Sequence, residues 1–349
     1  MTKLRLERAG RIVRPAIKIT IMTALLVLIA KQISWRDYEV LTVGGELQKR
    51  PGLASCLDAF APRLFLVAVL LQFASLACSA MRWRLLALVQ GINLGRQSAM
   101  SLTFLGEFFN HLLPGAVGGD FAKAYYLIRH NGNAAGAIAS IFVSRFVGVI
   151  TLISLASAIL VGMVASGEEF SGDLKFAATA IPLTLALILS VTVLFMNGRL
   201  MNSRILKSIA GRLPFAKRAV GLQEAFILYR RVVALWFPVF YRSICTVLFY
   251  VMSVMLVGLS LGVSVPWHHY FVYIPLVTLM SSLPLTPGGV GVFEELLLFF
   301  LARPGEESKV LLMALFCRLI LLICSLPGGV IFLFDKKTSI EGISSGHES

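Results

Sequence analysis

Charged residues are scarce in this chain. Asp, Glu, Lys and Arg together make up 14% of its 349 residues, whereas 57% are hydrophobic, and the mean hydropathy is +0.83. So few charged side chains cannot give a folded domain a normal water-exposed surface. The composition therefore excludes an ordinary soluble protein and predicts a polytopic membrane protein.

Cysteine pairs and nucleotide-binding motifs are also missing. The five cysteines include no CxxC pair; they are Cys56, Cys78, Cys245, Cys317 and Cys324. We therefore expect neither a disulfide framework nor a metal site. The sequence has no GxxxxGK[ST] phosphate loop, which excludes ATP hydrolysis by that route, and no cofactor is indicated.

Long apolar runs are what the chain has in abundance. About 20 apolar residues are needed to cross the hydrocarbon core of a bilayer. Runs of that kind lie at 16–33, 62–80, 136–165, 175–196, 236–262 and 309–334. They predict six full transmembrane helices.

Two further apolar stretches, about 98–131 and 270–302, are interrupted by Pro-Gly sequences. Because proline and glycine break helices, each stretch is predicted to form a helix, a turn and a second helix, and we expect two re-entrant hairpins. Irregular backbone at membrane depth survives only where protein or a water-filled cavity satisfies it. Both turns should therefore line a cavity, and the predicted fold class is all-α.

Lysine and arginine predict the orientation, because they accumulate on the cytoplasmic side of a membrane. Segments 1–18, 81–98, 197–231 and the tail after 334 carry nineteen of them, whereas the opposite segments carry eight. Both termini are therefore expected in the cytoplasm. The net charge of +14 then reflects topology and attraction to anionic lipid headgroups, and nucleic-acid binding is not expected.

A basic and aromatic cluster, Met81-Arg82-Trp83-Arg84, follows the run at 62–80. Tryptophan and basic side chains are enriched where helices meet the membrane surface. The cluster is therefore interpreted as an interfacial anchor on the cytoplasmic side.

One short motif occurs twice. Pro114-Gly115-Ala116-Val117-Gly118 recurs as Pro287-Gly288-Gly289-Val290-Gly291, and Arg145 and Arg318 each follow the proline of their copy by 31 residues. Three expected crossings separate the hairpins, and an odd number of crossings inverts the second copy. Oppositely oriented hairpins that form an inverted repeat are an architecture of transporters, with the substrate site between the repeats. The chain is thus predicted to move a polar group through a membrane.

The two arginines are predicted to lie deep in the membrane. Arg145 is about eleven residues, or roughly 16 Å, into its helix, and Arg318 is about nine residues into its own and similarly deep. Both are expected near the middle of a hydrocarbon core about 30 Å thick. A charge is costly at that depth, so each arginine should face the bundle interior beside a partner and serve function. The alternative is an internal ion pair that only fixes the packing of helices.

An acidic residue follows each turn, Asp120 in the first copy and Glu294 in the second. We expect these carboxylates to hold the arginines when no substrate is bound. N-capping of the following helix is at least as good an interpretation for Asp120, and the two roles are compatible. Glycine-rich turns also expose backbone N–H groups to anions. The expected phosphate cradle therefore includes Gly115, Gly118, Gly119, Gly288, Gly289 and Gly291.

Glu107, Asn110 and His111 precede the first turn, and their spacing places them on one helix face. Glu107 or His111 could carry protons for coupled transport. A satisfied polar stripe that lines a cavity is the favoured alternative. The second hairpin lacks this triplet, so the two halves are not functionally equivalent.

Taken as a set, these residues resemble a known family, the lysylphosphatidylglycerol synthase transmembrane region. Its flippase-like membrane domains also form the N-terminus of the multiple peptide resistance factor. The resemblance covers roughly 15–334 and rests on Phe109 to Gly115, Gly118-Gly119-Asp120, Ser144-Arg145, Pro287 to Gly291, Phe293-Glu294 and Arg318.

The resemblance implies a stand-alone form without the cytoplasmic aminoacyl-transfer domain of the bifunctional relatives, so synthesis of a lysyl lipid is not implied. We expect a basic cytoplasmic segment at 1–15, one flippase-like transmembrane domain at 16–334 and a disordered cytoplasmic tail at 335–349. The expected location is the cytoplasmic (inner) membrane of a bacterium or archaeon.

The leading hypothesis is a flippase or transporter, and not an enzyme, for the headgroup of a phospholipid, an aminoacylated lipid or a polyprenyl-phosphate-linked lipid. Its expected partners are membrane lipids, with a lipid-synthesising enzyme and a second copy of the chain as further candidates. One alternative is an integral membrane enzyme with Glu107, His111 and Asp120 as acid/base groups. Another is an ion or small-solute channel.

Overall fold

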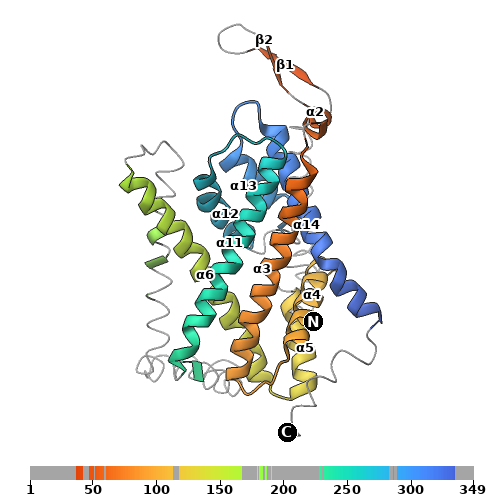
Figure 1. Ribbon diagram of the computed structural model, residues 1–349, viewed down its shortest axis with the longest axis vertical. Helices are drawn as coiled ribbons and strands as arrows, with labels where there is room; N and C mark the ends of the chain where they lie inside the picture. The colour runs from red at the N-terminus through yellow and green to blue at the C-terminus, as the bar shows by residue number, and fades with distance from the viewer. Residues whose placement is uncertain are drawn as a thin grey trace, which may run out of the picture. The chain divides into compact units, whose positions relative to one another are not determined.

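The computed structural model describes residues 37–41, 47–50, 52–58, 60–112, 118–166, 228–229, 232–282 and 289–334, together with residue 286 and a few positions between 179 and 190 (Figure 1). The expected segments 1–15 and 335–349 and the expected crossing at 16–33 lie outside these residues. So does most of the expected crossing at 175–196.

Four helices of the described chain are long and apolar enough to cross a membrane. They are α3 (Pro62–Val89), α6 (Ala134–Ala165), α11 (Trp236–Ser260) and α14 (Glu307–Phe334). Each corresponds to a run that the sequence predicted to span, and α3 continues nine residues beyond the apolar run that ended at 80. The protein is an all-α polytopic membrane protein.

Each interrupted stretch forms two helices, as predicted. The first contains α4 (Arg96–Leu112) and α5 (Gly118–Asn131), and the second contains α12 (Trp267–Ser281) and α13 (Val292–Leu301). Residues 113–117 of the first turn lie outside the described chain. That these pairs re-enter the membrane from opposite sides stays a prediction.

The backbone repeats more than the sequence motif does. After α3, the Ile92 N–H donates to Ala87 O at 3.1 Å, and after α11 the Val263 N–H donates to Gly258 O at 3.0 Å. Gly91 and Gly262 close these two turns with φ of 72° and 67°, a left-handed conformation that costs glycine little and terminates helices. Both copies therefore run long helix, glycine turn, helix, turn, helix, long helix.

A small β-hairpin precedes the first long helix, in a segment to which the sequence assigned no structure. Strand β1 (Tyr38–Leu41) pairs antiparallel with β2 (Leu47–Arg50), and the short helix α2 (Leu53–Asp58) follows. Asp37 Oδ1 accepts hydrogen bonds from Gly52 N at 2.8 Å and Ser55 Oγ at 2.6 Å. The pair Gly44-Gly45 between the strands is typical of hairpin turns and could have predicted it.

The chain divides into two compact units. Unit 1 contains residues 1–71, 110–118 and 251–323, and it includes all of α12 and α13. Unit 2 contains residues 72–109, 119–250 and 324–349, and it includes all of α6 and most of α4 and α5.

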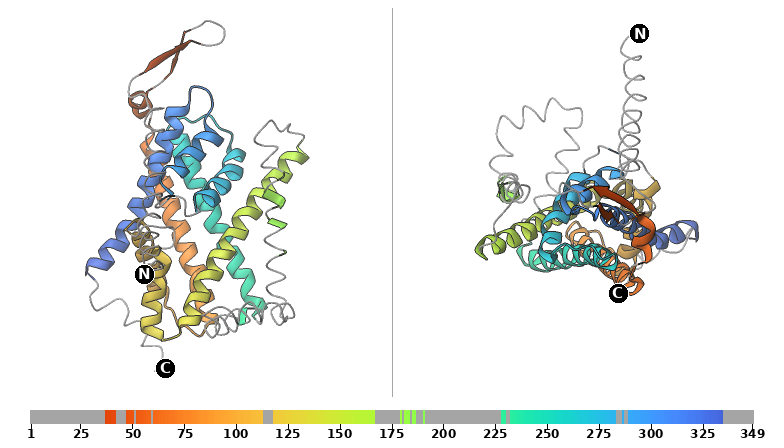
Figure 2. Two further views of the ribbon diagram at one scale, coloured as in Figure 1. Left: turned by 180° about the vertical axis from the view of Figure 1, so that it is seen from behind. Right: turned by 90° about the horizontal axis from the view of Figure 1, so that it is seen from above.

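The core of unit 2 packs α4 and α5 against α3 and α6, and α4 and α5 lie side by side (Figure 2). Gly106 of α4 permits this close approach. A Cβ there would lie 3.2 Å from Gly119 O and 2.6 Å from Cε of Lys123. Buried apolar side chains from all these helices fill the space between them, among them Trp83, Leu102, Leu127 and Ile141.

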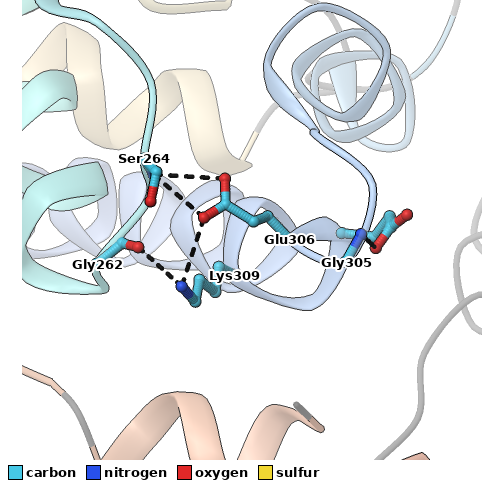
Figure 3. A network of polar contacts seen from close by, with 6 residues as sticks. Gly262, Ser264, Gly305, Glu306 and Lys309 are labelled. Carbon is cyan, nitrogen blue, oxygen red and sulfur yellow. Dashed lines mark hydrogen bonds and ion pairs between the residues drawn. The ribbon is translucent and has the colours of Figure 1, made fainter. Parts of the chain in front are cut away.

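In unit 1, a polar network fixes the start of α14 (Figure 3). The Glu306 carboxylate accepts from Ser264 N at 3.3 and 3.4 Å. Lys309 Nζ donates to Gly262 O at 2.9 Å and to Glu306 Oε1 at 3.5 Å. These bonds tie the loop between α11 and α12 to the first turn of α14.

Candidate functional site: two arginine–carboxylate centres

The two arginines occupy matched places in their helices. Arg145 is the twelfth residue of α6 and Arg318 is the twelfth residue of α14. Eleven residues of helix correspond to roughly 16 Å. Asp120 and Glu294 are likewise matched, each being the third residue of α5 or α13. The arginine and the acid therefore occupy equivalent helix positions in the two copies of the repeat.

The first centre lies in unit 2 and is built on an ion pair between Arg145 Nε and Asp120 Oδ2. The Asp120 side chain is 16% exposed and that of Arg145 is 46% exposed. Asp120 lies in the first turn of α5 and not at its N-cap, so the strict N-cap interpretation is wrong. A carboxylate in the first turn still interacts favourably with the helix dipole.

Lys123 follows Asp120 by one turn of α5. Its Nζ lies 5.4 Å from the centroid of the Trp83 ring, a cation–π distance. It is also within electrostatic range of Glu107, Asp120, Arg145 and Arg82. Lys123 therefore belongs to the first centre, although the sequence did not single it out.

Arg82 was expected at the membrane surface, but the structure buries it. Its side chain comes from α3, is buried, and donates to three serine hydroxyls: Ser243 at 2.7 Å, Ser144 at 3.3 Å and Ser79 at 3.4 Å. On α6, a Cβ at position 148 would lie 3.4 Å from the guanidinium, so Gly148 leaves room for its flat face.

The interfacial-anchor interpretation of Met81 to Arg84 is therefore wrong for Arg82 and Trp83. Trp83 is buried and its Nε1 donates to Ser140 Oγ at 3.3 Å. Both side chains point into unit 2 because α3 continues to Val89 and packs this part against α6. The sequence feature that could have predicted this burial is the pair Ser140 and Ser144, one turn apart on α6. Their hydroxyls accept from Trp83 and Arg82, respectively.

The second centre lies in unit 1 and is built on Glu294 and Arg318. Glu294 Oε1 accepts from Arg318 Nε at 2.8 Å, and Oε2 accepts from the Gly291 N–H at 2.7 Å. Glu294 is 4% exposed as a residue, and the Arg318 side chain is 28% exposed. One carboxylate thus caps α13 and neutralises the arginine.

Arg318 also holds the turn itself. Its Nη2 donates to Gly289 O at 2.8 Å, and its guanidinium carbon lies 5.1 Å from the centroid of the Phe293 ring. Gly289 has φ of 67°, and a Cβ there would lie 2.8 Å from Ser281 O. Only glycine fits both the left-handed backbone and this approach, so the arginine and the glycine shape the turn together.

The remaining predicted site residues are only partly placed. Gly118 and Gly119 are buried in the first turn of α5, and Gly291 caps α13, but Gly115 and Gly288 lie outside the described chain. Glu107, Asn110 and His111 all lie on α4, the first two half-buried and His111 exposed. Whether their common face meets water stays a prediction.

Each centre contains one arginine–carboxylate ion pair. Within the described residues, no group of three or more His, Cys, Asp and Glu side chains could hold a metal ion. Each centre instead pairs a guanidinium with a carboxylate, and guanidinium groups bind phosphate and carboxylate oxygens with similar geometry. An incoming phosphate could therefore replace the carboxylate as partner of either arginine.

Comparison with known proteins agrees with this architecture. A model of the family described as the lysylphosphatidylglycerol synthase TM region matches residues 52–328, which include both centres. The chain is also similar to a UPF0104 membrane protein of Methanothermobacter thermautotrophicus, with 23% identity over 268 residues, 71% of this chain and 78% of that protein. The expected resemblance is confirmed: the chain belongs to the lysylphosphatidylglycerol synthase TM region family.

Proposed function

We propose that this protein is a lipid flippase or transporter that carries phosphate-bearing headgroups across the membrane. The observation that carries the proposal is the matched pair of centres. Each sets an arginine twelve residues into an apolar helix against a carboxylate in the third position of a hairpin helix. Charges this far along a membrane-spanning helix are costly and rarely retained without function.

The family supports a lipid as the cargo, because its description names the membrane region of a lipid synthase. A headgroup phosphate would compete with Asp120 for Arg145 and with Glu294 for Arg318. Substrate can shift the protein between conformations only if it binds one of them more tightly. We expect release and recapture of the carboxylates to accompany this shift.

The alternative role of Asp120 as an acid/base group of an enzyme is less well supported. Its carboxylate is paired with Arg145, and this ion pair would have to break before the carboxylate could act on a substrate. We therefore propose that the protein is not an enzyme. We further propose the orientation predicted by the basic residues, with both termini in the cytoplasm.

The test is reconstitution of the purified full-length chain in liposomes with acyl-labelled fluorescent phospholipids, followed by dithionite quenching. Wild type should move at least one phosphate-bearing lipid, and the folded double variant Arg145→Ala, Arg318→Ala should not. Arg242→Gln is the matched control, because Arg242 also lies in a long apolar helix but donates to Pro238 O, outside both centres. Normal transport by the folded double variant would overturn the proposal.

A further inference from the structure

We propose that Arg82 and Lys123 extend the first centre into an anion-binding site that makes the protein selective for lipid headgroups of net negative charge. This inference rests on the proposed transport function and narrows its substrate class. It assigns a ligand-binding role to two residues outside the repeated motif.

Arg82 is a buried cation whose partners among the described residues are hydroxyl groups. The residue is 6% exposed, and its hydrogen bonds go to the hydroxyls of Ser79, Ser144 and Ser243. Within the part of the chain that the structure describes, no carboxylate lies within ion-pair distance of it. Burying an uncompensated charge is expensive, so an anion that reached Arg82 would gain a strong interaction.

The hydroxyls around Arg82 suit an anion as well as the guanidinium. A serine hydroxyl has one donor and two acceptor sites, and its proton rotates freely. Ser144 and Ser243 can thus accept from Arg82 and donate to an oxygen of a bound phosphate at the same time. This pattern of a guanidinium ringed by hydroxyls differs from Arg318, whose donors are bonded to a carboxylate and a carbonyl.

Arg82 lies next to the first centre. Its partner Ser144 directly precedes Arg145 on α6, and Lys123 is within electrostatic range of both arginines. The neighbourhood of Lys123 therefore contains three cations and two carboxylates: Arg82, Lys123 and Arg145 against Glu107 and Asp120. The formal charge of this group is +1.

The formal charge of the second centre has the opposite sign. Arg318 is paired there with Glu294, and Glu295 is within electrostatic range of Glu294, which gives these three residues a formal charge of −1 when all are ionised. Of the two centres, only the first has more cationic than anionic side chains among the residues counted here. A headgroup with net charge −1 neutralises this excess, whereas a zwitterionic headgroup brings an ammonium that the same cations repel.

The first experiment compares the transport of acyl-labelled phosphatidylglycerol, which is anionic, with that of acyl-labelled phosphatidylcholine, which is zwitterionic. Wild type should move the anionic lipid about tenfold faster. Arg82→Gln and Lys123→Gln should each lower the rate for the anionic lipid severalfold and so reduce the preference for it over the zwitterionic lipid. Lys123→Arg should keep the preference, and Arg242→Gln should behave as wild type.

Equal rates for the two lipids in wild type would overturn the inference and leave the transport function standing. Equal slowing of both lipids by Arg82→Gln and Lys123→Gln would also overturn it, because that result indicates a structural role. A loss of preference in these variants but not in Arg242→Gln would support it.

A binding measurement separates the inference from transport. The thermal unfolding of the purified protein in detergent would be followed with added phosphatidylglycerol, phosphatidylcholine or inorganic phosphate. Stabilisation by the anionic lipid alone, lost in Arg82→Gln, supports the site even if wild type moves no lipid, in which case only the proposed function fails. Equal stabilisation by the two lipids, or by inorganic phosphate and phosphatidylglycerol, would overturn a lipid-selective site.

Discussion

Glu294 and Arg318 are joined by a hydrogen bond of 2.8 Å between Oε1 and Nε, while the other oxygen of the same carboxylate receives the Gly291 N–H. Helix capping and arginine pairing are therefore performed by one side chain and are not alternatives. A ligand that displaced Glu294 from Arg318 would therefore also disturb the hydrogen bond to Gly291 before α13. Under the proposed function, we expect ligand binding to be coupled to movement of this turn through Glu294.

Two neighbouring glutamates provide a matched pair of substitutions. Glu294→Gln removes the charge that neutralises Arg318, so we expect the free energy of unfolding to fall by about 1–3 kcal/mol. Glu295→Gln should cost almost nothing, because Glu295 Oε1 is buried with no hydrogen-bond partner in the described chain and losing that charge relieves its desolvation. Thermal unfolding in detergent measures both, and equal losses would contradict this assignment of roles.

Gly289 should not tolerate a side chain. Alanine at this position would adopt φ near 67° and place Cβ 2.8 Å from Ser281 O, and the left-handed backbone alone costs about 1–2 kcal/mol. Gly289→Ala should therefore destabilise the protein and slow transport. Gly162→Ala in α6 is the control: in the described part of the chain, no atom beyond its own helix backbone lies within 4 Å of its Cβ position, and alanine is the better helix former. A Gly289→Ala variant as stable as the Gly162→Ala variant would be inconsistent with the turn described above.

Sequence reasoning located the features that depend on spacing along the chain. The shared distance of 31 residues from the proline of each motif copy to an arginine identified Arg145 and Arg318, and the structure pairs them with the acids that follow each turn. Arg82 and Lys123 were missed for a physical reason. Whether a basic side chain near a helix end reaches lipid headgroups or turns inward depends on which neighbouring helix presents hydroxyls or rings to it. The partners of Arg82 lie as far away as Ser243, 161 residues along the chain, and local patterns do not reveal such contacts.

The network at the start of α14 should stabilise unit 1 (Figure 3). Lys309→Met removes the donor to Gly262 O and the ion pair with Glu306. The side chain of Lys309 is 25% exposed and that of Glu306 is 14% exposed. We expect a loss of about 1 kcal/mol and faster amide hydrogen exchange in residues 261–266. Lys309→Arg, which keeps the charge, should lose less. Unchanged exchange in this loop would show that these bonds do not hold it.

Arginine should be needed more strictly at position 318 than at position 145. Arg318 uses two separate nitrogens, donating from Nε to Glu294 and from Nη2 to Gly289 O, and lies near the Phe293 ring. A lysine ammonium is a single point charge and cannot reproduce this geometry, so Arg318→Lys should lower both stability and transport. The Arg145 side chain is more exposed, at 46% against 28%, so a substitution there disturbs fewer packed neighbours.

Arg145→Lys should therefore keep most of the stability and a measurable part of the transport. The comparison requires thermal unfolding and liposome transport of both variants at one protein-to-lipid ratio. If Arg145→Lys were the more damaging substitution in both measurements, Arg318 would not be the arginine that shapes its turn. If Arg318→Lys lost stability but kept transport, its bonds to Glu294 and Gly289 would serve folding alone, and the first centre would carry the substrate contacts.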